Sequence, residues 1–180
     1  MAIYNTPSDA ANTAVRAFLT DVGKFYYDQS FNTGSGTGKT TWEAIQKDFG
    51  NACAYCGTDG KLQIEHLAMF NRAEYGLHHP GNIVPVCSGC NGREKHEKKY
   101  VPWQQQLALK ATGVSSFVIE ERRKRIEDHL VKYRYPSFSP QEQSAIAVIA
   151  ETLYENIKSE CEKSRALYEK LHTAFVAGDA

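Results

Sequence analysis

The sequence predicts an α+β protein whose small, metal-stapled module lies between N-terminal and C-terminal helical segments. Four cysteines form two Cys-x2-Cys pairs around strand-like segments: Cys53, Cys56, Cys87 and Cys90. The flanking segments instead carry apolar residues at the three-to-four spacing of amphipathic helices. Three parts follow: a helical segment with a Gly/Ser/Thr loop (1–50), the module (51–100) and a C-terminal helical region (101–180).

Length and composition are those of an ordinary soluble protein, with 180 residues, 42% apolar and 23% charged. No apolar run approaches the roughly 18 residues of a membrane span, and the start lacks the basic head and apolar run of a signal peptide. We therefore expect a cytoplasmic protein with no membrane partner. The paired cysteines favour metal over disulfides, and the fifth, Cys161, lies in a helical apolar pattern and is expected in a core.

Apolar periodicity predicts a helix over residues 8–30 and, after a polar loop over 32–40, a short helix to about Phe49. The spacing of Thr40 and Glu43 matches a capping box at the start of that second helix.

The loop segment 34–40 resembles a phosphate-binding P-loop. Thr33, however, occupies the position of the first glycine in that pattern, and no clear buried strand precedes it. We therefore expect a flexible linker and no nucleotide cofactor.

Two further helical segments follow the module. One is expected over residues 116–133, and apolar residues over 141–176 predict either one long amphipathic helix or two shorter ones. So long an apolar stripe packs on its own core or on a second subunit, which makes a homodimer a reasonable expectation.

Inside the module the pattern shortens to strands. Residues 61–66 alternate between apolar and polar, 82–86 form a partner strand, and 67–81 connect the two as a loop. The polar segment 91–99 is compatible with a helix. The expected order is therefore strand, loop, strand, helix.

The four cysteines suit a structural zinc site. Each Cys-x2-Cys pair presents two thiolates to one ion about 2.3 Å away, and two pairs complete a tetrahedron with no open position. We therefore expect Zn2+ at this cluster.

Glu65 and His66, at the end of the first strand, suit different chemistry. A neutral imidazole near a phosphate can take a proton from water, and a carboxylate can hold a hard divalent ion. Adjacent strand residues point to opposite faces, so both reach one site only if the strand ends or bends there. The long loop after His66 allows this.

In this context the sequence resembles the HNH, or ββα-metal, endonucleases, in the subgroup stapled by a four-cysteine zinc. The resemblance covers residues 53 to about 99: Cys-x2-Cys-Gly, then Ile64-Glu65-His66, then the segment from Gly81 to Asn91 that contains the second cysteine pair.

The resemblance implies a role for each matched position. His66 corresponds to the general base, Glu65 and Asn91 to the ligands of the catalytic ion, and Asn82 to the residue that fixes the loop and orients the base. It also implies 5′-phosphate ends. Oxygen ligands at both ligand positions favour Mg2+ or Mn2+ as the catalytic ion.

Positive charge follows the second cysteine pair. Residues 91–135 carry 11 basic and 6 acidic side chains, whereas the segments before and after are net acidic. Such a region suits DNA or is a solvated helix face. The candidate DNA-binding residues are Arg93, Lys95, His96, Lys98, Lys99, Arg122, Arg123, Lys124 and Arg125. We expect His78 and His79 to be loop residues, exposed to solvent or touching DNA.

The leading hypothesis is a metal-dependent DNA endonuclease, such as a restriction-type enzyme that cuts double-stranded DNA as a dimer. A phage, homing or modified-DNA nuclease fits equally well. The alternative is a zinc-ribbon module that binds nucleic acid and cuts nothing, which leaves Glu65, His66, Asn82 and Asn91 without a role.

Overall fold

The computed structural model describes residues 6–178, and the chain divides into two compact units. One unit comprises the residues up to Phe18 together with those from Phe138 onward, and the other spans Leu19–Ser137. The second unit contains the whole module and every candidate site residue. The division of the chain at residues 50 and 100 stays a prediction.

Helix α1 spans Pro7–Tyr27, close to the predicted segment 8–30. Thr6 caps its start, because the Thr6 hydroxyl oxygen accepts a hydrogen bond from the Asp9 amide at 3.2 Å. The helix stops where Asp28 adopts a φ of 58°, a left-handed conformation that cannot continue a right-handed helix.

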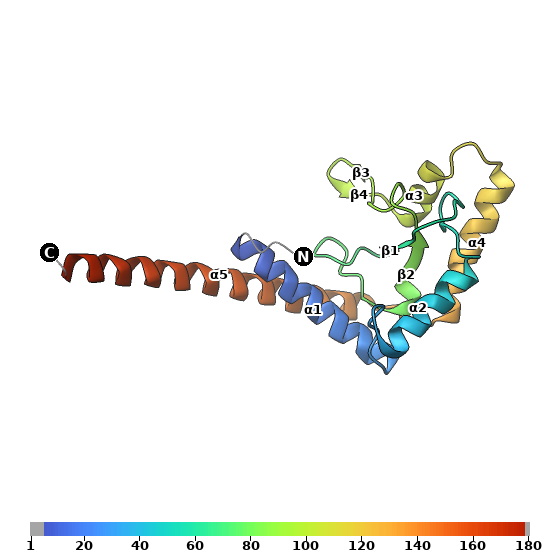
Figure 1. Ribbon diagram of the computed structural model, residues 1–180. Coiled ribbons are helices and arrows are strands. Elements are labelled where there is room, and N and C mark those ends of the chain that lie inside the picture. Colours follow the sequence, from blue (N-terminus) through green and yellow to red (C-terminus); the bar gives the residue numbers. More distant parts are fainter. Residues whose placement is uncertain (1–5, 179–180) are drawn as a thin grey trace. The chain divides into compact units, whose positions relative to one another are not determined.

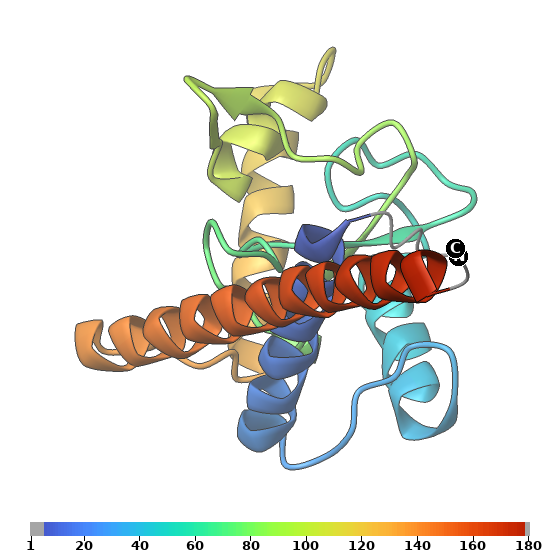
Figure 2. The same cartoon turned by 90° about the vertical axis from the view of Figure 1, so that its left-hand side faces the viewer.

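Helix α5 runs unbroken over Pro140–Gly178, so the C-terminal apolar stripe forms one helix and not two (Figure 2). Ser139 and Glu142 form a capping box, in which each backbone amide donates to the other side chain, at 2.7 and 3.3 Å. The buried positions of α5 lie in its first half: Ile146, Ala150 and Tyr154. Cys161, expected in a core, is only half-buried.

Strands β1 (Gln63–His66) and β2 (Ile83–Val86) form an antiparallel pair, as the alternating pattern predicted (Figure 1). The register places His66 opposite Ile83, and a turn of 3-10 helix, η1 (Pro80–Asn82), leads into β2. Every residue of β2 is buried. The end of β1 is therefore held beside a fully buried strand.

The segment 91–99 contains no helix, which corrects the prediction; residues Lys95–Tyr100 form a β-hairpin instead. Strands β3 (Lys95–His96) and β4 (Lys99–Tyr100) pair across Glu97 and Lys98, whose φ values of 49° and 67° are those of a two-residue type I′ turn. Gln106 anchors the hairpin base, because its side-chain oxygen accepts a hydrogen bond from the Glu94 amide at 3.0 Å. A helix, α3 (Trp103–Lys110), follows only after Pro102.

Helix α2 (Gly36–Asp48) ends where predicted but begins earlier, with Ser35 as its N-cap. Thr40 therefore lies inside the helix, and the predicted capping box and flexible linker are wrong for this segment. The glycine at position 38 allows a close approach: a β-carbon there would lie 2.3 Å from the backbone nitrogen of Asn32. Gly38 thus lets α2 pack closely against the backbone of Asn32.

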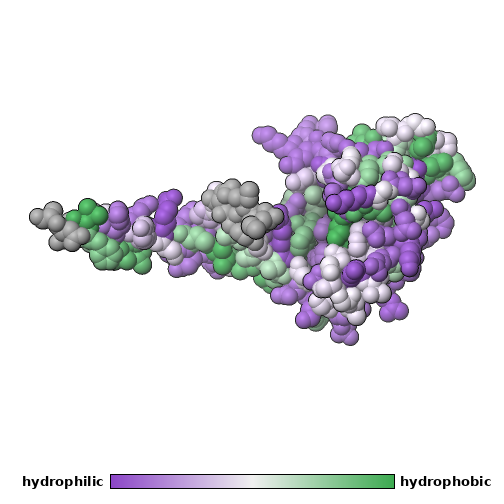
Figure 3. All heavy atoms as spheres, viewed as in Figure 1, coloured by the Kyte–Doolittle hydropathy of each residue, from purple (hydrophilic) through white to green (hydrophobic). Residues whose placement is uncertain are grey.

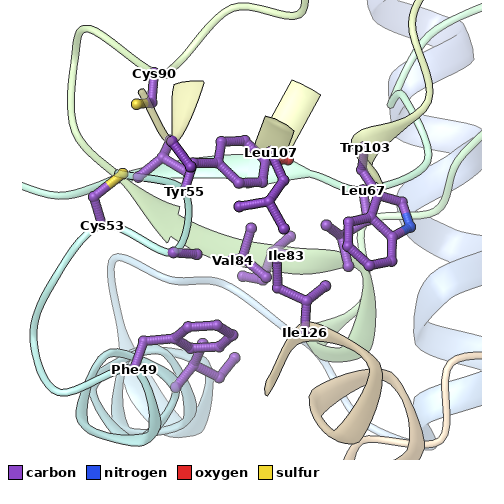
Figure 4. Close-up of a cluster of buried hydrophobic side chains, with 14 of the residues drawn as sticks. Phe49, Cys53, Tyr55, Leu67, Ile83, Val84, Cys90, Trp103, Leu107 and Ile126 are labelled. Carbon is purple, nitrogen blue, oxygen red and sulfur yellow. The ribbon is translucent and has the colours of Figure 1, made fainter. Parts of the chain in front are cut away.

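Helix α4 (Ser116–Lys132) matches the predicted segment, and with α2, α3 and the β1–β2 sheet it encloses one core. Figure 4 shows the core side chains, among them Phe49, Tyr55, Ile83, Val84, Leu107 and Ile126. Cys53 and Cys90 lie at one edge of this cluster (Figure 4). Packing of the core therefore helps to hold the cysteine side chains in place.

Helices combined with two small antiparallel sheets confirm the predicted α+β class. Within the described residues, none of the helices combines the length and apolar character that crossing a membrane requires.

Candidate metal centre and active site

The four cysteines converge on one point: Cys53, Cys56, Cys87 and Cys90. Their sulfur atoms all lie within 4.8 Å of one another. Four thiolates around one zinc ion stand about 3.8 Å apart in a regular tetrahedron, so the spacing fits. Within residues 6–178 this is the one group of three or more Cys, His, Asp or Glu side chains close enough to share an ion. The predicted metal-binding cluster is confirmed, and its ligand set is compatible with structural zinc.

The thiols of the cluster differ in how easily they ionise. Burial opposes ionisation of Cys56, but hydrogen bonds with Thr58 and the neighbouring thiols outweigh it and lower the Cys56 pKa to about 6. Burial and the charge of Cys53 raise the pKa of Cys90. Four thiolates this close repel one another, and a divalent cation removes that repulsion. The cluster is therefore built for a cation.

Arg122 of α4 is half-buried and supports the first cysteine pair, while its role in DNA binding stays a prediction. Its Nη1 donates a hydrogen bond to the Tyr55 carbonyl at 2.7 Å. Its guanidinium also lies against Gly57, where a β-carbon would meet Nη2 at 2.4 Å. The positively charged group is thus committed to the turn between Cys53 and Cys56.

Glu65 and Arg93 form a buried ion pair that the sequence did not predict. Nε and Nη2 of Arg93 donate to Oε1 of Glu65 at 3.0 and 2.9 Å, and the two side chains are 0% (Arg93) and 6% (Glu65) exposed. The guanidinium also donates to the carbonyls of Val101 and His66, at 3.0 and 2.8 Å. Burial raises the pKa of Glu65, and the charge of Arg93 opposes that rise.

Arg93 therefore ties the end of β1 to the hairpin and is closed to a DNA phosphate. Its predicted role in DNA binding is wrong, because no part of its side chain is exposed.

The predicted ligands of a second, hard metal ion do not form an open site. The Glu65 carboxylate faces the guanidinium of Arg93, which would repel a cation. Asn91 lies in a turn after the second cysteine pair, and its side-chain amide donates to Gln63 Oε1. The residues present do not fit Mg2+ or Mn2+, and that ion stays a prediction from the resemblance.

His66 ends β1 on the face opposite to Glu65, as the alternation of strand side chains requires. Its ring stacks on Phe70, with centroids 4.8 Å apart and an interplanar angle of 17°. Its Nε2 lies 3.1 Å from Nδ1 of His78. The half-buried imidazole is thus held from two sides at a partly exposed strand end.

Asn82 is fully buried and holds the loop that follows β1. Its Oδ1 accepts a hydrogen bond from the Ala68 amide at 2.7 Å, and its Nδ2 donates to the carbonyls of Ala68 and Leu77, at 2.9 and 2.8 Å. Its backbone carbonyl accepts a hydrogen bond from the Leu67 amide. Asn82 therefore fixes both ends of the loop that carries Phe70 and lies next to His78.

The other predicted DNA-binding side chains lie on two surfaces. The hairpin exposes Lys95, His96, Lys98 and Lys99, and Figure 3 shows this part of the surface as hydrophilic. Helix α4 exposes Arg123, Lys124 and Arg125. Glu120 pairs with the first of these and Asp128 with the second. The hairpin therefore offers more uncompensated positive charge than α4.

The tandem histidines His78 and His79 lie in the loop, as predicted, but are more buried than expected. His78, expected to be exposed to solvent or to touch DNA, is half-buried and contacts His66. His79 is 1% exposed, and its Nδ1 accepts a hydrogen bond from the Gly81 amide at 3.0 Å. Burial lowers the pKa of His79 to about 4. Nothing in the local pattern separates a buried loop histidine from an exposed one, and only the pairing of β1 with β2 brings this loop back onto His66.

Replacing Arg93 by methionine is expected to lower the free energy of unfolding by about 3 to 5 kcal/mol, because it leaves a buried, unpaired carboxylate. Urea denaturation measures this. The double variant Glu65→Gln/Arg93→Met should lose less free energy of unfolding than Arg93→Met. The free energy of unfolding of Lys95→Met, on the exposed hairpin, should change little. A loss under about 1 kcal/mol in Arg93→Met would show that the pair is not buried in solution.

The structure thus shows a small ββα-like element of β1, β2 and α3, together with a cysteine cluster able to bind metal. Comparisons with protein families, with curated proteins and with solved structures found no match to the chain.

Proposed function

We propose that this chain is a DNA endonuclease of the HNH type in which His66 is the general base. The position of the His66 imidazole carries the proposal: it ends β1, and Phe70 and His78 hold its ring. Asn82 pins the adjoining loop. An oriented imidazole at a partly exposed strand end can take a proton from water when the ring is neutral. The four-cysteine cluster and its core supply a rigid support for that geometry.

In the proposed reaction, His66 removes a proton from a water molecule as the oxygen of that water attacks the phosphorus of the DNA backbone. The bond from phosphorus to the 3′ oxygen breaks, and the 3′ oxygen leaves as a hydroxyl after taking up a proton from solvent. The product ends are a 5′-phosphate and a 3′-hydroxyl. We assign no step to Mg2+ or Mn2+, because Glu65 and Asn91 do not form an open site.

The β3–β4 hairpin is the proposed DNA contact. A two-stranded ribbon fits the major groove of DNA, and lysines contact phosphates. Lys95 lies 4.6 Å from the centroid of the Tyr100 ring, its cross-strand partner, which stabilises the hairpin by a cation–π interaction. The left-handed Glu97 and Lys98 make a tight tip.

Replacing Lys95, Lys98 and Lys99 by glutamine is expected to weaken DNA binding. The slope of log affinity against log salt is negative, and it should become shallower by about 2.7, because each of the three lost phosphate contacts removes about 0.9 from its magnitude. Fluorescence anisotropy on duplex DNA over a salt series measures it. A matched variant that removes three lysines of α5, Lys158, Lys163 and Lys170, should keep the wild-type slope; equal slopes in all three proteins would contradict the hairpin contact.

A zinc-ribbon module that binds nucleic acid without cutting it is the second candidate. The buried Glu65–Arg93 pair favours it, since that pair closes the carboxylate expected to hold a catalytic ion. The basic hairpin serves either function.

Incubation with supercoiled plasmid separates the two candidates. The protein is tested with Mg2+, with Mn2+ and with EDTA, and the ends of any product are sequenced. Cleavage with 5′-phosphate ends supports the nuclease, and the same reactions show which ion it needs. Tight binding with intact plasmid under all three conditions supports the binding module and contradicts the nuclease.

The proposal extends to a homodimer that cuts both strands, as a restriction-type enzyme does. Its support is the second half of α5, where large apolar side chains are exposed: Leu167, Leu171, Phe175 and Val176. Figure 3 shows apolar surface along this helix.

A further inference from the structure

A cavity of about 420 Å³ lies between the base of the hairpin, the start of α3, the end of α4 and the loop after β1. All of its lining residues belong to the Leu19–Ser137 unit. Sites for small organic ligands measure roughly 300 to 1,000 Å³ and combine an apolar lining with a few polar groups. Most of this lining is aromatic or apolar: Leu67, Tyr100, Pro102, Trp103, Leu130 and Tyr135.

The aromatic side chains of the lining suit a flat ligand. Tyr100 and Tyr135 are half-buried, and Trp103 lies close to Leu67 at one side of the hydrophobic core (Figure 4). Tyrosine and tryptophan rings present wide, rigid faces on which another flat ring can stack. Every nucleobase has such a face, and proteins that hold single bases use aromatic side chains in this way.

The charge of the lining selects a neutral group for the interior of the cavity. Glu74 is the charged side chain among the lining residues, and it is exposed. Its Oε2 accepts a hydrogen bond from the Met69 amide at 2.9 Å, which holds the carboxylate in place. A carboxylate repels a phosphate but accepts hydrogen bonds from the N–H groups of a base. Gln104, also exposed, adds a side-chain amide.

Tyr100 joins this cavity to the basic hairpin. It lines the cavity, and the ammonium group of Lys95 lies 4.6 Å from the centroid of its ring. A positive charge therefore lies directly beside a stacking surface, and a nucleotide carries a flat, neutral base together with an anionic phosphate. Two other lining residues, Leu67 and Ala68, follow His66 in the chain. The cavity thus borders both segments that the proposed function assigns to DNA.

We propose that the cavity receives one nucleobase turned out of the DNA duplex, while Lys95 holds the phosphate of the same nucleotide. This inference rests on the proposed DNA contact of the hairpin, and it adds the form of the substrate: DNA with an unpaired base at the site. Turning a base out of the duplex breaks its pairing and stacking, which costs least where the base has no partner. Bulged DNA should therefore bind more tightly than fully paired DNA.

Three short duplexes test the proposal by binding alone. One carries a single bulged adenine, the second carries the same bulge without its base, and the third is fully paired. Fluorescence anisotropy without added Mg2+ or Mn2+ gives the affinities. The adenine bulge should bind roughly fivefold to hundredfold more tightly than the abasic bulge, because stacking of one base contributes about this much. Equal affinities for these two bulges would overturn the proposal, since a flexible backbone is common to both.

Two variants locate the binding site of the base. Tyr100→Leu removes the stacking surface, whereas Ala68→Leu fills part of the cavity and leaves Lys95 and Tyr100 in place. Both should lose the preference for the adenine bulge, and Tyr168→Leu, at an exposed tyrosine of α5, should keep it. Zinc content and thermal midpoint verify folding, and if Tyr100→Leu fails to fold, Ala68→Leu decides. A folded Ala68→Leu protein with the full preference would exclude the cavity as the site.

A free nucleotide offers the same base and phosphate, so deoxyadenosine monophosphate is tested as a competitor. Displacement of the bulged duplex only at concentrations far above those of an unlabelled duplex supports DNA as the ligand. Displacement at equal concentrations assigns the cavity to free nucleotides and overturns the proposal.

Failure of this inference is distinguishable from failure of the proposed function. A protein that prefers the adenine bulge and leaves plasmid intact contradicts the nuclease alone. A protein that cuts plasmid without any preference for the adenine bulge overturns the base-binding cavity alone, and a protein that binds no duplex overturns both.

Discussion

Replacing Cys87 by alanine is expected to abolish metal binding at the four-cysteine cluster and to unfold the Leu19–Ser137 unit. The structural zinc of small domains contributes about 10 to 16 kcal/mol, while a whole domain is stable by only about 5 to 15 kcal/mol. Cys53 and Cys90 also belong to the hydrophobic core, so losing the ion disturbs packing as well as the turns. Metal content, circular dichroism and thermal unfolding measure the effect, and excess chelator should reproduce it in the wild-type protein.

The fifth cysteine supplies the control. Cys161 lies on α5, outside the cluster, and is half-buried. Cys161→Ala should keep one zinc per chain and stay within about 1 kcal/mol of wild type, as substitutions outside buried, tightly packed sites usually do. A Cys87→Ala protein as stable as the parent, or wild-type protein purified without bound metal, would contradict the structural role of the cluster.

Replacing His66 by alanine is expected to lower the rate of DNA cleavage by about 10²- to 10⁴-fold, the usual contribution of a general base. The fold should survive, because the ring is only half-buried and stacks on a loop residue, Phe70, outside the hydrophobic core. Arg93 holds the His66 carbonyl whatever the side chain. Single-turnover kinetics with excess protein separate this loss of rate from any loss of DNA affinity.

An exposed histidine on α5, His172, supplies the control for the His66→Ala variant. His172→Ala removes an imidazole of the same chemistry and should cut at the wild-type rate. If both alanine variants lose activity equally, the loss reflects stability, and the base is not His66.

Much of the fold could be predicted because its signals are local. Cys-x2-Cys spacing predicts the metal cluster, alternation predicts β1 and β2, and three-to-four periodicity predicts α1, α4 and α5. The helix prediction for 91–99 is wrong because the tip of the hairpin consists of Glu97 and Lys98. These residues take left-handed conformations without the Asn or Gly that mark such turns. A polar, charged sequence of this kind also suits a helix, and only its anchoring by Gln106 of α3 selects the hairpin.

The strand positions of the site residues could be predicted from the sequence, but the side chains that they contact could not. The strand pattern places Glu65 and His66 on opposite faces, yet it does not show that Arg93, 28 residues later, is buried against the carboxylate. A charged side chain after a cysteine pair is usually exposed, and burial here depends on long-range contacts with Val101 and the β1 backbone. The same holds for His78, which reaches His66 across a loop closed by tertiary packing.

The central claim is that a zinc-stapled module presents His66 for hydrolysis of the DNA backbone. Its most direct test is the rate at which wild-type and His66→Ala proteins of equal zinc content nick supercoiled plasmid. We predict nicking with 5′-phosphate ends by the wild-type protein and a rate at least about 10²-fold lower for the variant. Equal rates in the two proteins, or intact plasmid with wild-type protein in Mg2+ and in Mn2+, would contradict the account.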